Sequence, residues 1–160
     1  MTVRRLLAYA LTAITVAAGS IMLGANPASA SLPRCDGIVQ IWDFTYRQDA
    51  TLWYGTAPGS NINCENSIND QSLKLISVIV LQESLNNCYG PQGQYAQLFS
   101  PVLAVDGSYG PKTTAAVRAL QSYLTVGVDG RAGPQTRSHM ALYDEQNQQC
   151  TMAATPIQIR

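Results

Sequence analysis

The sequence is poor in charge and in histidine. Only 12% of its 160 residues are Asp, Glu, Lys or Arg, and ten basic residues balance ten acidic ones. Nucleic-acid recognition rests on dense Lys and Arg, so this composition argues against it. His139 is the single histidine, and it stands in no His-Glu-x-x-His or His-x-Glu pattern. We therefore expect no metal site, no cofactor and no metal-dependent catalysis.

Long apolar runs are equally scarce. One uncharged run, Leu6 to Leu23, follows Arg4-Arg5 and precedes the small-x-small sequence Ala28-Ser29-Ala30. This pattern is typical of a signal peptide cleaved before Ser31, exported by either the Sec or the twin-arginine route. We expect residues 1–30 to be removed, leaving a mature chain that is secreted, extracellular or cell-wall associated and has no membrane segment. Without Arg4-Arg5, eight basic residues face ten acidic ones, a net charge of −2.

All four cysteines follow the expected cleavage site: Cys35, Cys64, Cys88 and Cys150. An even number of cysteines in an exported chain predicts two disulfides, and three pairings are open at this point. Zinc sites use closer ligand pairs such as Cys-x-x-Cys, which the chain lacks. With all four cysteines in disulfides, no thiol remains as a nucleophile.

The mature chain divides into three stretches. Residues 31–70 are aromatic and polar, residues 71–150 carry helical patterns, and residues 151–160 form a short tail. Ile38 to Asp43 alternates too loosely to decide between a small hairpin and a loop. The first stretch is rich in aromatic residues, which we expect to pack over the helices or, alternatively, to form a sugar-stacking surface: Trp42, Phe44, Tyr46, Trp53 and Tyr54.

An internal repeat is the most informative feature. The segment from Val105 to Thr113, VDGSYGPKT, recurs from Val128 to Thr136 as VDGRAGPQT. A second self-match, 39 residues apart, relates two apolar stripes and their glutamines: Val78, Leu81, Gln82 and Leu85 correspond to Val117, Leu120, Gln121 and Leu124. These matches predict three similar helices, two of which are preceded by the same turn.

Each part of the repeat has a physical role. Asp-Gly favours a turn, because Asp accepts local N–H groups and Gly adopts positive φ. Gly-Pro opens a helix, since Pro at its first position loses no needed hydrogen bond. The apolar stripes then predict helices from Leu73 to about Tyr89-Gly90, from Pro111 through Leu124, and from Pro134 through Tyr143. The turn residues are predicted to be structural: Asp106, Gly107, Gly110, Pro111, Asp129, Gly130, Gly133 and Pro134.

A Leu-Gln-x-x-Leu-Asn helix followed by two Val-Asp-Gly-x-x-Gly-Pro-x-Thr segments resembles the peptidoglycan-binding domain 1 family. The resemblance covers Ser72 to Tyr143, and Cys88-Tyr89-Gly90 is similar to small secreted actinobacterial members. It implies an all-α fold, a compact three-helix bundle at 71–150, with a disulfide-tethered, loop-rich extension at 31–70. It also implies a non-catalytic role in binding peptidoglycan, through glycan strands or stem peptides, and we expect a monomer. In related modules a cysteine before the first helix meets one after the third, which suggests Cys64–Cys150 and leaves Cys35–Cys88.

Peptidoglycan offers sugars with apolar faces and peptides with carboxylates. Aromatic rings suit the former, and arginines and helix N-termini suit the latter. Tyr109 and Arg131 occupy equivalent positions in the two repeat loops, and Arg118 lies on the helix between them. We predict a shallow binding groove formed by six residues: Tyr109, Thr113, Arg118, Gln121, Arg131 and Thr136. Thr113 and Thr136 have an equally strong alternative role as helix caps.

Two other functions remain open from the sequence. One is a secreted protein-interaction or inhibitor module on the same fold. The other is a small cell-wall hydrolase, with Asp106 and Asp129 as its carboxylates. Both aspartates lie in turns where Asp normally serves the backbone, so we expect no enzyme.

Overall fold

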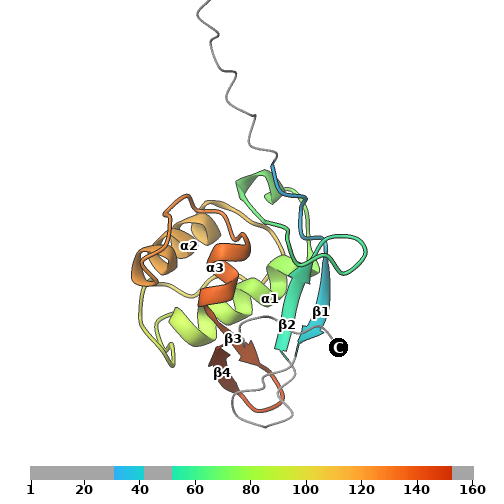
Figure 1. Ribbon diagram of the computed structural model, residues 1–160. Coiled ribbons are helices and arrows are strands. Elements are labelled where there is room, and N and C mark those ends of the chain that lie inside the picture. Colours follow the sequence, from blue (N-terminus) through green and yellow to red (C-terminus); the bar gives the residue numbers. More distant parts are fainter. Residues whose placement is uncertain (1–30, 42–51, 153–160) are drawn as a thin grey trace, which may run out of the picture. The chain divides into compact units, whose positions relative to one another are not determined.

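The computed structural model describes residues 31–41 and 52–152, without the side chains of residues 52 and 53. The expected signal peptide, the aromatic residues between 42 and 46 and the tail from residue 153 lie outside these ranges. The elements run in the order β1 (Gly37–Ile41), β2 (Leu52–Thr56), a 3-10 helix η1 (Ile68–Asp70), α1 (Ile76–Ser84), a π-helical turn η2 (Leu85–Tyr89), α2 (Pro111–Tyr123), α3 (Pro134–His139), β3 (Ala141–Asp144) and β4 (Gln149–Met152) (Figure 1). Within the described ranges, no helix has the length and apolarity needed to cross a membrane.

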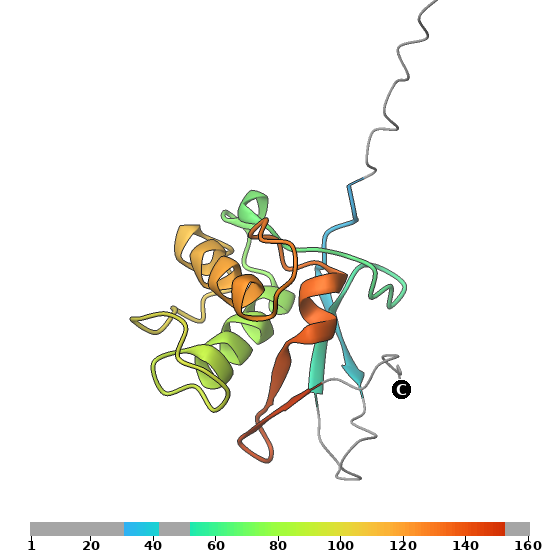
Figure 2. The ribbon, with the colours of Figure 1, turned by 60° about the vertical axis from the view of Figure 1, so that its left-hand side comes forward.

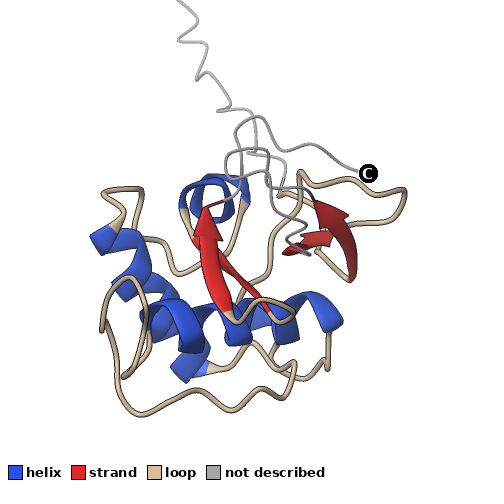
Figure 3. Ribbon diagram, turned by 90° about the horizontal axis from the view of Figure 1, so that it is seen from below, coloured by secondary structure: helices blue, strands red, loops and turns tan. Residues whose placement is uncertain are grey.

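The prediction of an all-α fold is wrong, because two antiparallel strand pairs accompany the helices (Figure 3). In the first pair Gly37 lies opposite Thr56, and in the second Ala141 lies opposite Met152. Residues 31–41 and 52–152 therefore form a mixed α/β structure. The first pair occupies the stretch whose alternation left hairpin and loop undecided.

The third helix is shorter than predicted. It ends at His139, and Met140 has extended dihedral angles, φ −92° and ψ 151°. Beyond it, the Ala141 N–H donates to the Tyr89 hydroxyl at 2.6 Å and the Tyr143 N–H donates to Ser84 Oγ at 3.1 Å. These bonds and the pairing with β4 replace the helical bonds that the apolar stripe predicted. Tertiary contacts have overridden a weak local preference.

Helix α1 is the centre of the core. It contacts β1, β2 and β3, and Figures 1 and 2 show it between α2 on one side and the β1–β2 pair on the other. Its residue Val78 is fully buried in one apolar cluster with Leu120 of α2, Ile41 of β1 and Tyr54 of β2. The core thus takes residues from both sides of residue 70.

The disulfides join Cys35 to Cys64 and Cys88 to Cys150, with Cα–Cα distances of 5.2 and 5.7 Å. The presence of two disulfides is confirmed, whereas the Cys64–Cys150 and Cys35–Cys88 pairing suggested by the resemblance is wrong. The physical reason is which backbone segments lie beside each cysteine. The Cys35 N–H donates to the Glu65 carbonyl at 3.1 Å, which brings Cys35 beside Cys64. The β3–β4 pair in turn places Cys150 beside η2, which carries Cys88.

Candidate functional site

A buried glutamine holds the first repeat turn. Gln82 Nε2 donates to Asp106 Oδ1 at 3.0 Å, to the Ser108 carbonyl at 3.0 Å and to Thr113 Oγ1 at 3.3 Å. Gln82 Oε1 accepts the N–H of Asp106 at 3.1 Å and that of Gly107 at 2.9 Å. One carboxamide on α1 therefore fixes the turn and the start of α2.

Gln121 of α2 repeats this network in the second turn. Its Nε2 donates to Asp129 Oδ1 at 2.7 Å, to the Arg131 carbonyl at 3.0 Å and to Thr136 Oγ1 at 2.9 Å. Its Oε1 accepts the Gly130 N–H at 2.8 Å. Both glutamines are 1% exposed. Because each helix holds the turn that follows it, the two self-matches in the sequence describe one structural unit used twice.

The aspartates serve their turns. Asp106 Oδ1 accepts the Ser108 N–H at 2.9 Å, and Asp129 Oδ1 accepts the Arg131 N–H at 2.8 Å. The Ser108 N–H and then the Gln82 amide lower the pKa of Asp106, because both donate to its ionised form. Gly107 has a left-handed φ of +73°, and a Cβ there would lie 3.0 Å from the Leu75 backbone.

The predicted groove is not assembled as an exposed surface. Tyr109 is fully buried, and its hydroxyl donates to the Gly130 carbonyl at 2.9 Å. Thr113, Gln121 and Thr136 are buried in the glutamine networks. Arg131 forms an ion pair with Glu65. Sequence position made Tyr109 and Arg131 equivalent, but the aromatic ring turns inward because it can bury its apolar surface and still satisfy its hydroxyl.

Arg118 is the predicted residue that stays exposed beside open space. Two hollows, of about 320 and 590 Å³, meet at Pro111. The first is lined by Leu103, Ala104, Asp106 and Lys112, among others, and the second by Ile68, Thr114, Ala115 and Arg118. We call the residues of both hollows the α2 surface.

The α2 surface is positively charged around the start of the helix. Lys112 and Arg118 are exposed, and neither forms an ion pair within the described ranges. Gly110 precedes the helix without a side-chain cap, so the first N–H groups of α2 add partial positive charge. The first hollow is lined by both a negative side chain, Asp106, and a positive one, Lys112. In the second hollow, Arg118 is the charged lining residue.

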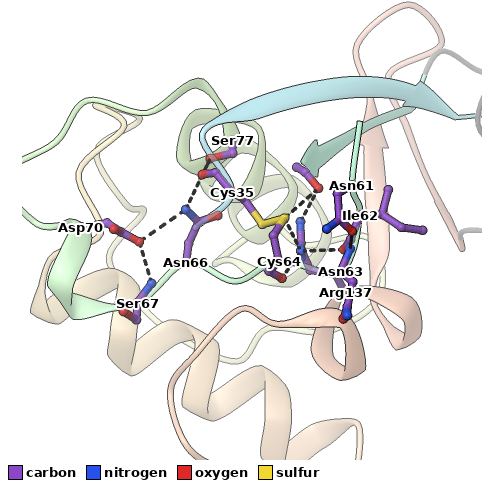
Figure 4. The surroundings of a disulfide bond; sticks show 11 residues. Cys35, Asn61, Ile62, Asn63, Cys64, Asn66, Ser67, Asp70, Ser77 and Arg137 are labelled. Carbon is purple, nitrogen blue, oxygen red and sulfur yellow. Dashed lines mark hydrogen bonds between the residues drawn. A yellow bond between two sulfur atoms is a disulfide. The ribbon is translucent and has the colours of Figure 1, made fainter. Parts of the chain in front are cut away.

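Sequence reasoning missed Arg137, which is 4% exposed (Figure 4). Its Nη1 donates to the Gly55 carbonyl at 2.7 Å, and its Nη2 donates to the carbonyls of Cys64 at 2.5 Å and Ile62 at 3.4 Å. Its guanidinium carbon lies 4.7 Å from the Tyr54 ring centroid. Burial lowers the pKa of Arg137. No local sequence pattern marks it, because the carbonyls that it contacts belong to residues 55, 62 and 64.

His139 is exposed at the end of α3, where its Nδ1 lies 2.8 Å from the Gln135 carbonyl. All four cysteines are in disulfides. Over residues 31–41 and 52–152, no three His, Cys, Asp or Glu side chains gather in an arrangement that could hold a metal ion.

Residues 77–140 match the model of a family described as putative peptidoglycan binding domain. The matched segment contains α2, α3, nearly all of α1 and both repeat turns. Both strand pairs lie outside it. No curated protein and no solved structure matches the chain.

Proposed function

We propose, from the match of residues 77–140 to a peptidoglycan-binding family, that this protein is exported and binds cell-wall peptidoglycan without cleaving it. The α2 surface is the observation that carries the proposal. It lies within the matched part of the fold, apart from Ile68, and combines hollowed apolar surface with two exposed cations.

The chemistry of the α2 surface suits stem peptides. Lys112 and Arg118 are free to pair with peptide carboxylates, and Arg can do so with two parallel hydrogen bonds. Ile68, 43% exposed, offers apolar contact in the hollow that Arg118 lines, and Pro111 does so in both hollows. The binding role predicted for Arg118 is retained in this proposal, and Lys112, Pro111 and Ile68 replace the buried residues of the predicted groove.

Export is supported by two independent features. The first is the signal-peptide pattern of residues 1–30, with its small-x-small sequence before Ser31. The second is the pair of disulfides, which form and persist in oxidising compartments. Both features agree with a protein that crosses the membrane and reaches the wall on its outer side.

The non-catalytic part of the proposal is supported by the state of Asp106. Hydrogen bonds lower its pKa, so it is ionised at neutral pH and cannot act as a general acid there. Asp129 makes the same contacts in the second turn. Both carboxylates are engaged by the backbone of the turns that they hold.

Sedimentation with purified peptidoglycan sacculi tests the proposal. The disulfide-bonded protein should pellet with sacculi, and less so as salt rises, because salt screens exposed charges. The Lys112→Gln/Arg118→Gln variant should lose most of this retention. The charge-matched control Arg34→Gln/Lys74→Gln, which alters neither hollow, should keep it. Failure of the wild-type protein to pellet with sacculi of several bacteria would reject the proposal.

A further inference from the structure

A third hollow, of about 430 Å³, lies at the C-terminal end of α1, where the chain continues into η2. It is bordered by η2, by the loop that follows η2 and by the turn between β3 and β4; Figure 1 shows β3 and β4 beside this end of α1. Its polar lining consists of carboxamides and one phenol: Asn86, Asn87, Gln92, Gln94, Gln148 and Tyr143. We call it the amide hollow. No Asp, Glu, Lys, Arg or His lines it.

Two of these carboxamides build the walls. Asn86 Nδ2 donates to the Leu103 carbonyl at 2.9 Å and Asn86 Oδ1 accepts the Leu103 N–H at 2.8 Å. Gln94 Nε2 donates to the Gln148 carbonyl at 2.9 Å and Gln94 Oε1 accepts the Cys150 N–H at 2.9 Å. Each amide clamps a separate backbone segment, so the hollow has its shape without a ligand. The Cys88–Cys150 disulfide ties η2, which carries Asn86, to β4.

Other carboxamides keep hydrogen-bonding capacity. Gln92 and Gln148 are exposed, and their side chains make no hydrogen bond within the described ranges. Asn87 uses Nδ2 to donate to the Glu83 carbonyl at 2.9 Å, and its Oδ1 accepts no hydrogen bond from the described residues. Gln148 also has a left-handed φ of 52°, a conformation that costs energy in a residue with a side chain.

We propose that the amide hollow binds a neutral saccharide that carries hydroxyl and acetamido groups. A carboxamide offers both donors and an acceptor, as do hydroxyl and acetamido groups, so the two sets pair without any charge. A charged ligand would find no counter-charge among the lining residues. The half-buried Tyr143 ring, with Pro91 and Val102 at the rim, supplies apolar contact for the C–H face of a sugar ring.

This inference deepens the proposed function and rests on it for the source of the saccharide, a glycan strand of the wall. Its chemistry does not depend on the α2 surface. The two surfaces differ in a measurable way: binding at Lys112 and Arg118 is electrostatic and weakens with salt, whereas binding between neutral groups does not.

Chitotetraose, a neutral oligomer of N-acetylglucosamine, is the probe. In an NMR titration of the purified, disulfide-bonded protein, it should cause saturable shifts in the side-chain amide signals of Asn87, Gln92 and Gln148. The apparent Kd should not change when salt is raised. The Gln92→Ala/Gln148→Gly variant removes two free carboxamides and relieves the left-handed backbone at residue 148. It should bind at least roughly tenfold more weakly, since one hydrogen bond corresponds to roughly a fivefold change in Kd.

The control is Gln97→Ala, which removes an exposed glutamine from the same loop but not from the hollow, and should bind as the wild type does. No saturable shifts, unchanged affinity in the double variant, or a salt-dependent Kd would each overturn the proposal. So would equal competition by the neutral peptide N-acetyl-trialanine amide, since that would make the hollow a peptide site. If sacculi retain the protein but chitotetraose does not bind, this inference alone fails. If chitotetraose binds but sacculi do not retain the protein, the role of the α2 surface fails.

Discussion

A single carboxamide organises each repeat turn. Gln82 and Gln121 each satisfy a glycine N–H, an aspartate, a main-chain carbonyl and a threonine hydroxyl. Buried polar groups are costly when unpaired, so a residue that pairs several at once specifies one turn conformation. Thr113 and Thr136 serve the fold rather than a ligand, because their hydroxyls are hydrogen-bonded to these buried glutamines.

Arg137 joins α3 to the N-terminal segment through the carbonyls of Gly55, Ile62 and Cys64. Replacing it in the variant Arg137→Met would leave the carbonyls of Gly55, Ile62 and Cys64 without this donor in a buried site. We expect the free energy of unfolding, measured by urea denaturation of the oxidised protein, to fall by roughly 3 kcal/mol.

The exposed arginine Arg118 provides the matched control for this experiment. Arg118→Met should change the unfolding free energy by less than about 0.5 kcal/mol, as surface substitutions do. A loss below about 1 kcal/mol in Arg137→Met would show that the buried guanidinium does not hold this segment.

At the residue level, the sequence predicted which residues form the turns better than it predicted which side chains point into the core. The turn pairs Asp106-Gly107 and Asp129-Gly130 follow from local preferences that any chain shares. The inward orientation of Tyr109 depends on Gly130, a partner 21 residues away, which periodicity does not contain. Arg137 was missed for the same reason, because all its partners lie more than 70 residues earlier in the chain.

Among the elements, the starts of the helices could be predicted from the sequence, whereas the end of α3 could not. Helices α2 and α3 begin at Pro111 and Pro134, as predicted, because Gly-Pro sets the start locally. The end of α3 and the strand after it are determined by Tyr89, Ser84 and β4, which are distant in sequence. The all-α prediction failed at that point, since the same apolar stripe can be buried in either conformation.

The disulfide pattern gives a direct test at this scale. A peptide map without reduction should contain Cys35–Cys64 and Cys88–Cys150, and a Cys64–Cys150 peptide would contradict the structure. The variant Cys88→Ala/Cys150→Ala opens a loop with a sequence separation of 62. It should lose about 4 kcal/mol of unfolding free energy, and Cys35→Ala/Cys64→Ala slightly less, because its loop is shorter.

For the molecule as a whole, stability should depend on the carboxylate pair Glu83 and Glu145. Burial, then the charge of Glu145 and a hydrogen bond between the two carboxyl groups, raises the pKa of Glu83. A raised folded-state pKa contributes stability that is fully present below the unfolded-state pKa and is lost as pH rises through the folded-state value. Asp106 has the opposite sign: its lowered pKa contributes stability that is lost as pH falls through its folded-state value.

The variant Glu83→Gln should therefore be more stable than the wild type at neutral pH, and this difference should shrink as the pH falls into the carboxyl range. Thermal unfolding from neutral pH down to about pH 4 measures it, close to the ordinary pKa of Glu. The exposed carboxylate Asp36, changed to Asn, is the control and should not reproduce the trend. A constant difference between Glu83→Gln and the wild type at every pH would contradict the coupling.

Over residues 31–41 and 52–152, the chain presents two surfaces of different chemistry, the charged α2 surface and the neutral amide hollow. The repeat in the sequence led to the resemblance to a peptidoglycan-binding family, which the match of residues 77–140 supports, and the predicted groove contained Arg118, one residue of the α2 surface. It could not find the amide hollow, because that hollow is assembled from η2, the following loop and the β3–β4 turn, whose proximity depends on the tertiary structure.

Isothermal titration with a soluble disaccharide-peptide fragment of peptidoglycan tests the central claim, wall binding through the α2 surface, most directly. We expect saturable binding that weakens at least roughly fivefold in Arg118→Gln, since a charged hydrogen bond contributes at least that factor. We expect no change in Lys74→Gln, an exposed lysine that lines neither hollow of the α2 surface. No binding by the wild-type protein, or an equal loss in both variants, would contradict wall binding through this surface.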